Sequence, residues 1–351
     1  MKATAVAPSN IAFIKYWGKK DEVLRIPLNG SISMNLSNLL TTTTVEFNRD
    51  FKKDIISINQ EFLTYSSSDR SESRSLKDNS SRLARTIRET NDFTRIAKHL
   101  DRIRLLAKIN YRAKVISKNN FPTSTGLSSS ASGFAALTLA ASKAAGLNLS
   151  EKELSILARL GSGSACRSIP DGFVEWLDGK TNDTSYAVSL YPQNYWDIVD
   201  IVAIVGRDKK EVSTAEGQKL VNSSPFFSTR LARIKEKISL IKKYLKEKNF
   251  KLFGELIEQE ALELHAIMLT STPSLIYLLP ETLRVMRYVK KWREEGLEVY
   301  FTINTGQNIH LICQKQDANK VAKRASGLSG VTKTIINFPS EGARLMDKHL
   351  F

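Results

Sequence analysis

A serine-rich loop in the middle of the chain has the composition of a phosphate-binding site. It reads NNFPTSTGLSSSAS, in which Pro122, Gly126 and a serine run at 128–130 precede an Ala-rich helix that starts near Ala131. Small side chains allow backbone N–H groups to approach phosphate oxygens, and the N-terminus of a helix adds a favourable dipole. The loop lacks the GKS/T and GxGxxG patterns. Taken alone, it predicts either a phosphate site or an ordinary capped helix.

The chain carries a large excess of positive charge, +16 at pH 7. Such an excess attracts polyanions: nucleic acid, an acidic membrane surface or phosphorylated small molecules. Many cations lie between Arg70 and Arg112, where the aromatic residues are limited to Phe93 and Tyr111, so base stacking is poorly supported. The alternative is a solvated helical face beside an anion pocket, formed by Arg82, Arg85, Arg88, Arg95, Lys98, Arg102, Arg104, Lys108 and Arg112.

Cysteine and histidine usage argues against disulfides and a structural metal site. Cys166 and Cys313 are far apart, which is typical of free thiols in a reducing cytosol. The four histidines form no HExxH-type pattern, so we expect no metal ligands. No apolar run reaches the roughly 18 residues of a membrane span. Pro-Ser-Asn at 8–10 interrupts the apolar residues near the start, so this segment lacks the h-region of a signal peptide. We therefore expect a cytoplasmic protein.

The elements that position these residues read as strands and helices in mixed order. Strands are expected at 2–7, 31–36, 41–47, 54–58, 111–117, 173–177, 185–190 and 196–205. An exposed loop is expected at 66–81, followed by a helix whose apolar stripe is Ile96, Leu100, Ile103 and Leu106. Further helices are expected from the serine loop to Gly146 and at 151–160, where Ser150 is the candidate N-cap.

A polar break at 211–225 separates a second region of mixed elements. Helices are expected at 230–250, 252–269, 281–292 and 318–325, and strands at 299–305, 309–313 and 331–338. This pattern predicts an α+β fold of two lobes, residues 1–205 and 206–351, with a ligand-binding cleft between them.

Four segments resemble a known family. PTSTGLSSSAS, at 122–132, resembles the ATP-phosphate loop of the GHMP kinase superfamily. APSNIAFIKYWGKKD (Ala7–Asp21), RLGSGSACRSIPDGFVEW (Arg159–Trp176) and YFTINTGQN (Tyr300–Asn308) narrow the resemblance to the diphosphomevalonate and phosphomevalonate decarboxylases. The resemblance implies a two-lobed GHMP-kinase-like fold, whose N-terminal, nucleotide-binding lobe is similar to domain 2 of ribosomal protein S5.

The resemblance implies a two-step reaction of isoprenoid biosynthesis, in the mevalonate pathway, with ATP and Mg²⁺ as cofactors. ATP phosphorylates the tertiary 3-hydroxyl of a mevalonate that carries phosphate or diphosphate at O5. Phosphate then leaves while the carboxylate is lost as CO2, which gives an isopentenyl phosphate or diphosphate. Several anionic groups meet in one pocket, so several cations are needed there.

The resemblance also implies roles for individual residues. Lys15 would lie near the reacting oxygen and the transferred phosphate, and Arg167 would grip the substrate carboxylate with its planar guanidinium. Substrate contacts are implied for Tyr16, Lys19, Arg95, Ser162 and Ser164, and nucleotide contacts for Gly126, Ser128, Ser129 and Ser130. Without the resemblance, Lys15 is a surface lysine beside a strand and Arg95 a solvated helix residue.

The family pattern F-x-x-D-x-G-x-N is broken at its catalytic aspartate, where this chain has Asn304. An amide can hydrogen-bond to the tertiary hydroxyl but cannot act as its base, so we expect the phosphorylation step to be impaired. Three explanations are open. An aspartate was replaced to trap substrate and ATP; or a natural enzyme decarboxylates a 3-phosphorylated mevalonate derivative without ATP; or positioning and charge neutralisation suffice for phosphoryl transfer.

The substrate and the functional class also have alternatives. PLNGSISMNL (Pro27–Leu36) and SIPDGFVEW (Ser168–Trp176) are more similar to the monophosphate branch, which favours mevalonate 5-phosphate over the 5-diphosphate. A plain GHMP-type kinase would release no CO2. An RNA-binding protein would show salt-sensitive binding but would leave the motifs around Lys15 and Arg167 without a role. We expect a small-molecule substrate, no nucleic-acid or membrane partner, and a homodimer, which is common in the family.

Overall fold

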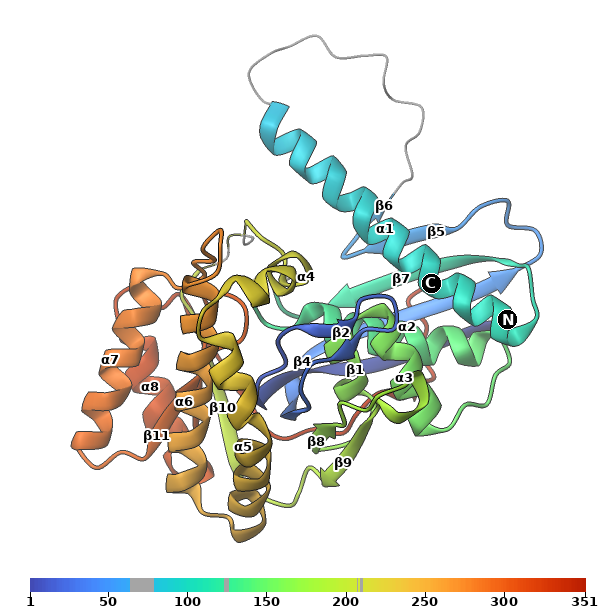
Figure 1. Cartoon of the computed structure of the whole chain (residues 1–351). Helices are drawn as coiled ribbons and strands as arrows, with labels where there is room; N and C mark the ends of the chain where they lie inside the picture. The colour runs from blue at the N-terminus through green and yellow to red at the C-terminus, as the bar shows by residue number, and fades with distance from the viewer. Residues whose placement is uncertain (64–78, 123–125, 207, 209–210) are drawn as a thin grey trace.

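The structure is a computed structural model that describes residues 1–63, 79–122, 126–206, 208 and 211–351, except for the side chains of 79–91. Most of the loop expected at 66–81 lies outside the described residues, and residues 79–81 open a helix instead. The side chains of Arg82, Arg85 and Arg88 lie outside them as well. Figure 1 shows the described elements in two groups, each built on its own sheet.

The first group is built on an eight-stranded sheet of order β14-β1-β4-β7-β5-β6, in which β8 pairs with β4 and with β9. All of its strand pairs are antiparallel except β5 with β7. The strands are β1 (Lys2–Ile14), β4 (Ser31–Asn48), β5 (Ile55–Ile58), β6 (Glu61–Leu63), β7 (Arg112–Asn119), β8 (Phe173–Trp176), β9 (Ala187–Tyr191) and β14 (Arg344–Met346). A separate hairpin consists of β2 (Lys19–Asp21) and β3 (Ile26–Pro27).

Three strand predictions near the N-terminus were wrong in their bounds. The segments 31–36 and 41–47 form the single strand β4, and β1 continues seven residues past Ala7 to Ile14. The register of β1 against β4 shifts between Pro8 and Asn10, and such an irregularity accommodates a proline, which cannot donate a ladder hydrogen bond. The ladder therefore runs through the expected break and ends directly before Lys15.

Helices α1 (Asn79–Ala107), α2 (Ser129–Ala144) and α3 (Glu151–Gly161) pack in one core with strands of this sheet. Ser150 caps α3 as predicted, because its hydroxyl accepts the Glu153 N–H and the Glu153 carboxylate accepts the Ser150 N–H. Short 3₁₀ turns follow at η1 (Gly163–Ser168) and η2 (Asn182–Thr184).

The second group is an antiparallel sheet of order β11-β12-β10-β13 with helices on both faces. Its alternate residues pack with α5 and α6 on one face and with α7 and α8 on the other (Figure 1). The elements are β10 (Ile198–Ile204), α4 (Thr214–Gly217), η3 (Gln218–Ser223), α5 (Phe227–Glu247), α6 (Phe250–Leu269), α7 (Pro280–Glu294), β11 (Val299–Thr302), β12 (Ile309–Gln314), η4 (Lys315–Asp317), α8 (Ala318–Ser326) and β13 (Lys333–Asn337).

The lobe boundary at residue 205 stays a prediction, and sheet membership bears on it at two places. β10, which precedes residue 205, pairs with β12 and β13 of the second sheet, whereas β14 near the C-terminus pairs with β1 of the first. One apolar core joins residues of β1 and β4 to α5 and α6. Among the described helices, none combines the length and apolar character needed to cross a bilayer.

Candidate active site

Lys15 lies directly after β1 and is only 2% exposed. Its ammonium donates hydrogen bonds to the Ala12 carbonyl at 2.6 Å and to Oδ1 of Asn304 at 3.2 Å. Both partners are neutral. The fold thus brings together two predicted catalytic residues that are 289 positions apart in the sequence.

Burial makes Lys15 titrate near neutrality. It lowers the pKa of Lys15 from 10.5 to about 7; the negative charge of Glu260 opposes this shift, and the positive charges of Arg167 and Arg230 add to it. An anion bound beside the ammonium would raise this pKa again. Lys15 is therefore not the exposed surface lysine that a reading without the family resemblance predicts.

Asn304 lies in the turn between β11 and β12, where a strand was expected to continue to residue 305. Its Oδ1 accepts from Lys15, and its Nδ2 donates to Oγ of Ser128 at 3.1 Å. The serine loop also contacts this turn through glycine: a Cβ on Gly126, at φ +92°, would lie 2.8 Å from Cα of Gly306. The structure therefore places the candidate nucleotide loop against the residue where the family pattern is broken.

Arg167 lies in η1 and is 4% exposed. Its guanidinium donates to Oγ of Ser33 at 3.0 Å, Oγ of Ser31 at 2.6 Å and Oδ1 of Asn10 at 3.0 Å. Within the described part of the chain, no carboxylate lies within ion-pair distance of it, and burial lowers its pKa. A buried cation with only neutral partners is unfavourable unless a ligand supplies the opposite charge. This environment fits a residue that binds a carboxylate.

Ser162 lies beside Ser130, and Gly163 lies beside Tyr16. The Tyr16 hydroxyl donates to Oε1 of Gln218 at 3.0 Å, and the hydroxyl of Ser162 lies 3.3 Å from that of Ser130. A Cβ on Gly163 would lie 3.0 Å from the Tyr16 ring, so a side chain there would press on the tyrosine. The structure therefore brings predicted substrate and nucleotide residues together.

The remaining predicted residues lie in three different settings. The main-chain carbonyl of Ser164 accepts from Nδ2 of Asn10 at 3.3 Å. The side chain of Asn10 also binds Arg167. Ser129 begins α2, and Ser128 precedes it at φ 55° without capping the helix through its side chain. The ammonium of Lys19 forms an ion pair with Glu22 at 2.6 Å, and burial lowers its pKa.

Two guanidinium groups meet at the end of α3, and only one of them was predicted. Nη2 of Arg95 donates to the carbonyl of Gly161 at 3.4 Å, and Nε of Arg25 donates to that of Leu160 at 3.2 Å. Arg95 also pairs with Asp92 at 3.3 Å. The charge of Arg25 contributes to lowering the pKa values of Lys19 and Arg95. These three cations therefore lie near one another and form the basic end of the candidate site.

The sequence patterns also missed other residues close to the candidate site. Ser31 and Ser33 alternate along β4, so the sequence alone could have placed them on one face. Arg25 follows the IKYWGKKD motif and has φ 52°. No sequence pattern predicts this left-handed conformation. Glu260 and His265 lie on α6, and an amphipathic pattern does not tell which of its polar residues reach a site.

Comparisons with known proteins identify the family over most of the chain. Residues 7–187 match the Diphosphomevalonate decarboxylase-like N-terminal domain, and residues 200–344 the Mevalonate 5-diphosphate decarboxylase C-terminal domain. The diphosphomevalonate decarboxylase of Candida albicans is 33% identical over 91% of this chain and 86% of its own length. That of Bos taurus is 34% identical over 87% and 75%.

Solved structures give the same result for the fold. Mevalonate diphosphate decarboxylase from Staphylococcus aureus superimposes with a TM-score of 0.87 at 35% identity, covering 99% of this chain and 98% of that one. The Enterococcus faecalis enzyme has a TM-score of 0.85 at 31% identity, covering 99% of each chain. The predicted α+β, GHMP-kinase-like fold is confirmed. This chain belongs to the diphosphomevalonate decarboxylase family.

Proposed function

We propose that the protein decarboxylates a mevalonate phosphorylated at O5, and that it uses ATP and Mg²⁺ to do so. The observation that carries the proposal is the pair of buried cations, Lys15 and Arg167, in one site where the side-chain partners of both are neutral. A related structure in this fold is described as a complex with MVAPP, AMPPCP and magnesium. Cations arranged in this way suit a substrate that is anionic at both ends.

The residues present fit a nucleotide. Gly126 packs on Gly306 with no space for a Cβ. The N-terminus of α2 follows Ser128 directly, and the dipole of a helix N-terminus favours phosphate oxygens. Among the described residues, no cluster of three or more His, Cys, Asp or Glu side chains could hold a metal ion. Mg²⁺ would therefore bind mainly through phosphate oxygens. When bound, the nucleotide supplies the phosphoryl group that makes the 3-oxygen a leaving group.

The side chains then have separate tasks in the decarboxylation. Arg167, held by two serines and an asparagine, binds and orients the substrate carboxylate. Lys15 neutralises charge on the phosphate that departs from C3. As the C1–C2 bond breaks, its electron pair forms the C2–C3 double bond while the C3–O bond breaks, so CO2 and phosphate leave together. The burial of both cations excludes water that would weaken these interactions.

A second candidate function is favoured by Asn304. Its amide bonds to Lys15 through oxygen and to Ser128 through nitrogen, and an amide cannot take the proton of the 3-hydroxyl. A substrate that already carries phosphate at O3 needs no such base. The candidate is therefore an ATP-independent decarboxylase of a 3-phosphorylated mevalonate derivative.

One set of assays separates these possibilities. CO2 release is measured with mevalonate 5-phosphate and 5-diphosphate, each with and without ATP and Mg²⁺, and with 3-phosphorylated mevalonate derivatives without ATP. Comparison of kcat/KM for the two O5 forms tests the proposed preference for the monophosphate. CO2 release only from a 3-phosphorylated substrate would replace the first proposal with the second. Release from none would refute both.

Two further proposals concern the protein as a whole. We propose a cytosolic location and a homodimer, which subcellular fractionation and light scattering would test.

The pH dependence should follow Lys15. The ammonium is needed beside the phosphate, so kcat/KM is expected to fall as pH rises through about 7, the pKa to which burial lowers Lys15. The Lys15→Arg variant, which stays charged, should lose this falling limb even if its activity is lower. An unchanged limb in Lys15→Arg would show that another group titrates.

The same pKa has a stability consequence of defined sign. Between about 7 and 10.5 the unfolded chain keeps a proton on Lys15 that the folded chain has released. Through Lys15, the free energy of unfolding therefore increases as pH rises through this range, so the folded chain becomes more stable.

Arg25 should contribute to substrate binding at the basic end. The Arg25→Gln variant is expected to raise KM about 10-fold, the value of one charge-assisted hydrogen bond, with kcat changed less than about threefold. Lys20→Met is the matched control, because Lys20 is on the same hairpin but pairs at the surface with Asp178 at 3.5 Å. Equal KM values for the two variants would contradict a role of Arg25 in binding.

A further inference from the structure

Helix α6 contacts main-chain atoms on both sides of the Lys15–Asn304 pair. Oε2 of Glu260 accepts the N–H of Lys15 at 3.0 Å, and Nε2 of His265 lies 3.1 Å from the carbonyl oxygen of Asn304. The two α6 residues are five positions apart, a rise of about 7.5 Å along the helix. One rigid element therefore reaches the backbone of both residues.

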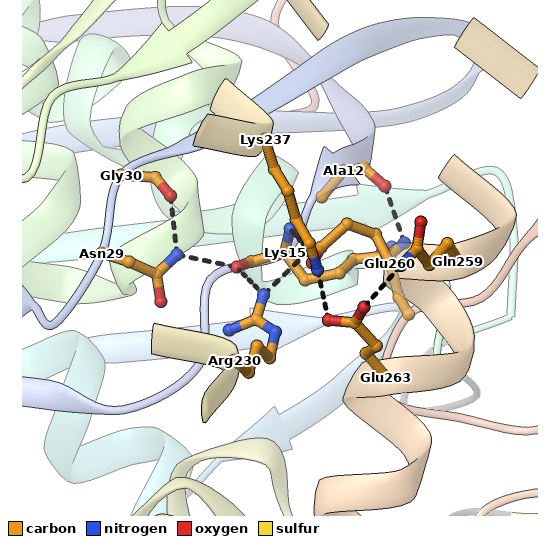
Figure 2. A network of polar contacts seen from close by, with 10 residues as sticks. Ala12, Lys15, Asn29, Gly30, Arg230, Lys237, Gln259, Glu260 and Glu263 are labelled. Carbon is orange, nitrogen blue, oxygen red and sulfur yellow. Dashed lines mark hydrogen bonds and ion pairs between the residues drawn. The ribbon is translucent and has the colours of Figure 1, made fainter. Parts of the chain in front are cut away.

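The Glu260 carboxylate is fully buried, and each of its oxygens has fixed partners. Oε2 also accepts from Nη2 of Arg230 at 2.8 Å, and Oε1 accepts from Nζ of Lys237 at 2.9 Å. The same Nη2 of Arg230 donates to the carbonyl of Lys15 at 2.8 Å. Figure 2 shows these side chains converging on Lys15 from α5 and α6. The N–H and the C=O of residue 15 are thus both held by one buried ion pair.

The cations keep this carboxylate ionised. Burial by itself would raise the pKa of Glu260, but Arg230 and Lys237 outweigh burial and hold the pKa below its usual value. Lys237 also pairs with Glu263, which lies on the outer side of the cluster with 28% of its side chain exposed. Glu260 is therefore the acidic centre of the cluster, and Glu263 is its partly exposed rim.

His265 acts on the other side through an uncharged contact. It is buried, and burial lowers its pKa to about 4, so the ring is neutral at physiological pH. A carbonyl oxygen only accepts, so Nε2 must carry the ring proton and donate it to Asn304. A third α6 side chain supports β11, the strand that precedes the Asn304 turn, because Oε1 of Glu258 accepts the N–H of Phe301 at 3.1 Å.

We infer that Glu260 and His265 are positioning residues, and that α6 uses them to hold the Lys15 ammonium and the Asn304 side chain in contact through the main chain. Both hydrogen bonds are made to backbone atoms. They therefore do not depend on whether the side chain of residue 304 is an amide or a carboxylate. The inference concerns the site of the proposed function and rests on that function only for its kinetic readout.

The charged groups that face Lys15 come from four elements. They are Glu260 on α6, Arg230 on α5, Arg167 in η1 and Asp200 on β10. The two carboxylates favour the ammonium and the two guanidinium groups oppose it. Removal of the Glu260 charge should therefore favour neutral Lys15.

The first test compares Glu260→Gln with Glu263→Gln. Both remove a carboxylate that pairs with Lys237, but only Glu260 touches Lys15. The ε-carbon resonances of ¹³C-lysine-labelled protein are titrated, with Lys15→Met to assign the signal. The pKa of Lys15 should fall by about 1 unit in Glu260→Gln and stay unchanged in Glu263→Gln. Identical titrations of Lys15 in the two variants would overturn the role of Glu260.

The NMR titration requires no turnover, so failure of the proposed function leaves it interpretable. Where an activity is measured, kcat should fall at least about 10-fold in Glu260→Gln while KM changes little, because small displacements of reacting groups act on the chemical step. A merely structural role would lower the unfolding temperature of both variants and leave the Lys15 titration unmoved.

The second test uses His265 and decides the matter if Glu260→Gln does not fold. His265→Gln keeps an N–H that can reach the Asn304 carbonyl, whereas His265→Leu has none. The Leu variant should lose at least about 10-fold in kcat at unchanged KM, and the Gln variant should recover most of this loss. Equal kcat values for the two variants would overturn the inference.

Discussion

The Asn304→Asp variant is expected to turn over ATP and substrate at least about 100-fold faster than the chain with Asn304, the low end for general base catalysis. A carboxylate at this position can accept the proton of the 3-hydroxyl, and it faces the Lys15 ammonium, 3.2 Å from the present Oδ1. The Ser128 hydroxyl, which now accepts from Nδ2, can rotate to donate instead. Initial rates of ADP and CO2 formation with each O5-phosphorylated mevalonate measure the effect.

The new charge should also change the pH profile. A carboxylate beside Lys15 raises its pKa above about 7, so the falling limb of kcat/KM should move to higher pH. The matched control is Asn308→Asp, which adds the same charge in the same turn. Oδ1 of Asn308 accepts from the N–H groups of Val205 and Gly206, contacts that a carboxylate would keep. This control should gain no activity.

The outcome with ATP separates the explanations of Asn304. Equal ATP-dependent rates of the parent chain and the Asn304→Asp variant would show that positioning and charge neutralisation suffice, and would exclude a replacement made to trap substrate. A parent chain that acts only on 3-phosphorylated substrates, together with an Asn304→Asp variant that gains ATP use, would support the second candidate function.

The Arg167→Met variant is expected to lose about 1,000-fold in kcat/KM, because a buried charge-assisted contact to the substrate carboxylate is removed. The same variant should unfold at an equal or higher temperature than the parent chain. In the absence of substrate, Arg167 is a buried cation whose hydrogen-bond partners are two hydroxyls and an amide, and its removal relieves unfavourable burial of charge. Steady-state kinetics and thermal unfolding in the absence of ligand measure the two effects.

Arg159→Met provides the contrast. Arg159 is also buried, but it donates to main-chain carbonyls of Leu24, Asn182 and Ser185 that would be left unpaired. Its replacement should lower the free energy of unfolding by about 3 kcal/mol. Destabilisation of Arg167→Met as large as that of Arg159→Met, or retention of activity by Arg167→Met, would contradict a carboxylate-binding role.

Local sequence patterns predicted most of the elements. Period-2 and period-3.6 patterns located the main strands and helices, and Ser150 with Glu153 marked the start of α3. The patterns failed where pairing overrode a local break, as at Pro8 in β1, because hydrogen bonds to β4 on both sides of the bulge hold the strand together. They also failed at residues 303–305, which form part of a turn rather than an extension of β11.

The sequence by itself determined which chemical groups are available: a lysine, an arginine, a serine loop and an amide in place of a carboxylate. These are fixed by residue type and motif, which require no contact between distant segments. Only the tertiary structure decided that Lys15 lies against Asn304 and that Arg167 has neutral partners. It also decided that Arg25 reaches the end of α3, and that Glu260 and His265 contact the main chain of Lys15 and Asn304. The charge state of a side chain, and the groups that it contacts, depend on burial and on neighbours that packing brings from distant segments. The residue type at one position specifies neither the burial nor those neighbours.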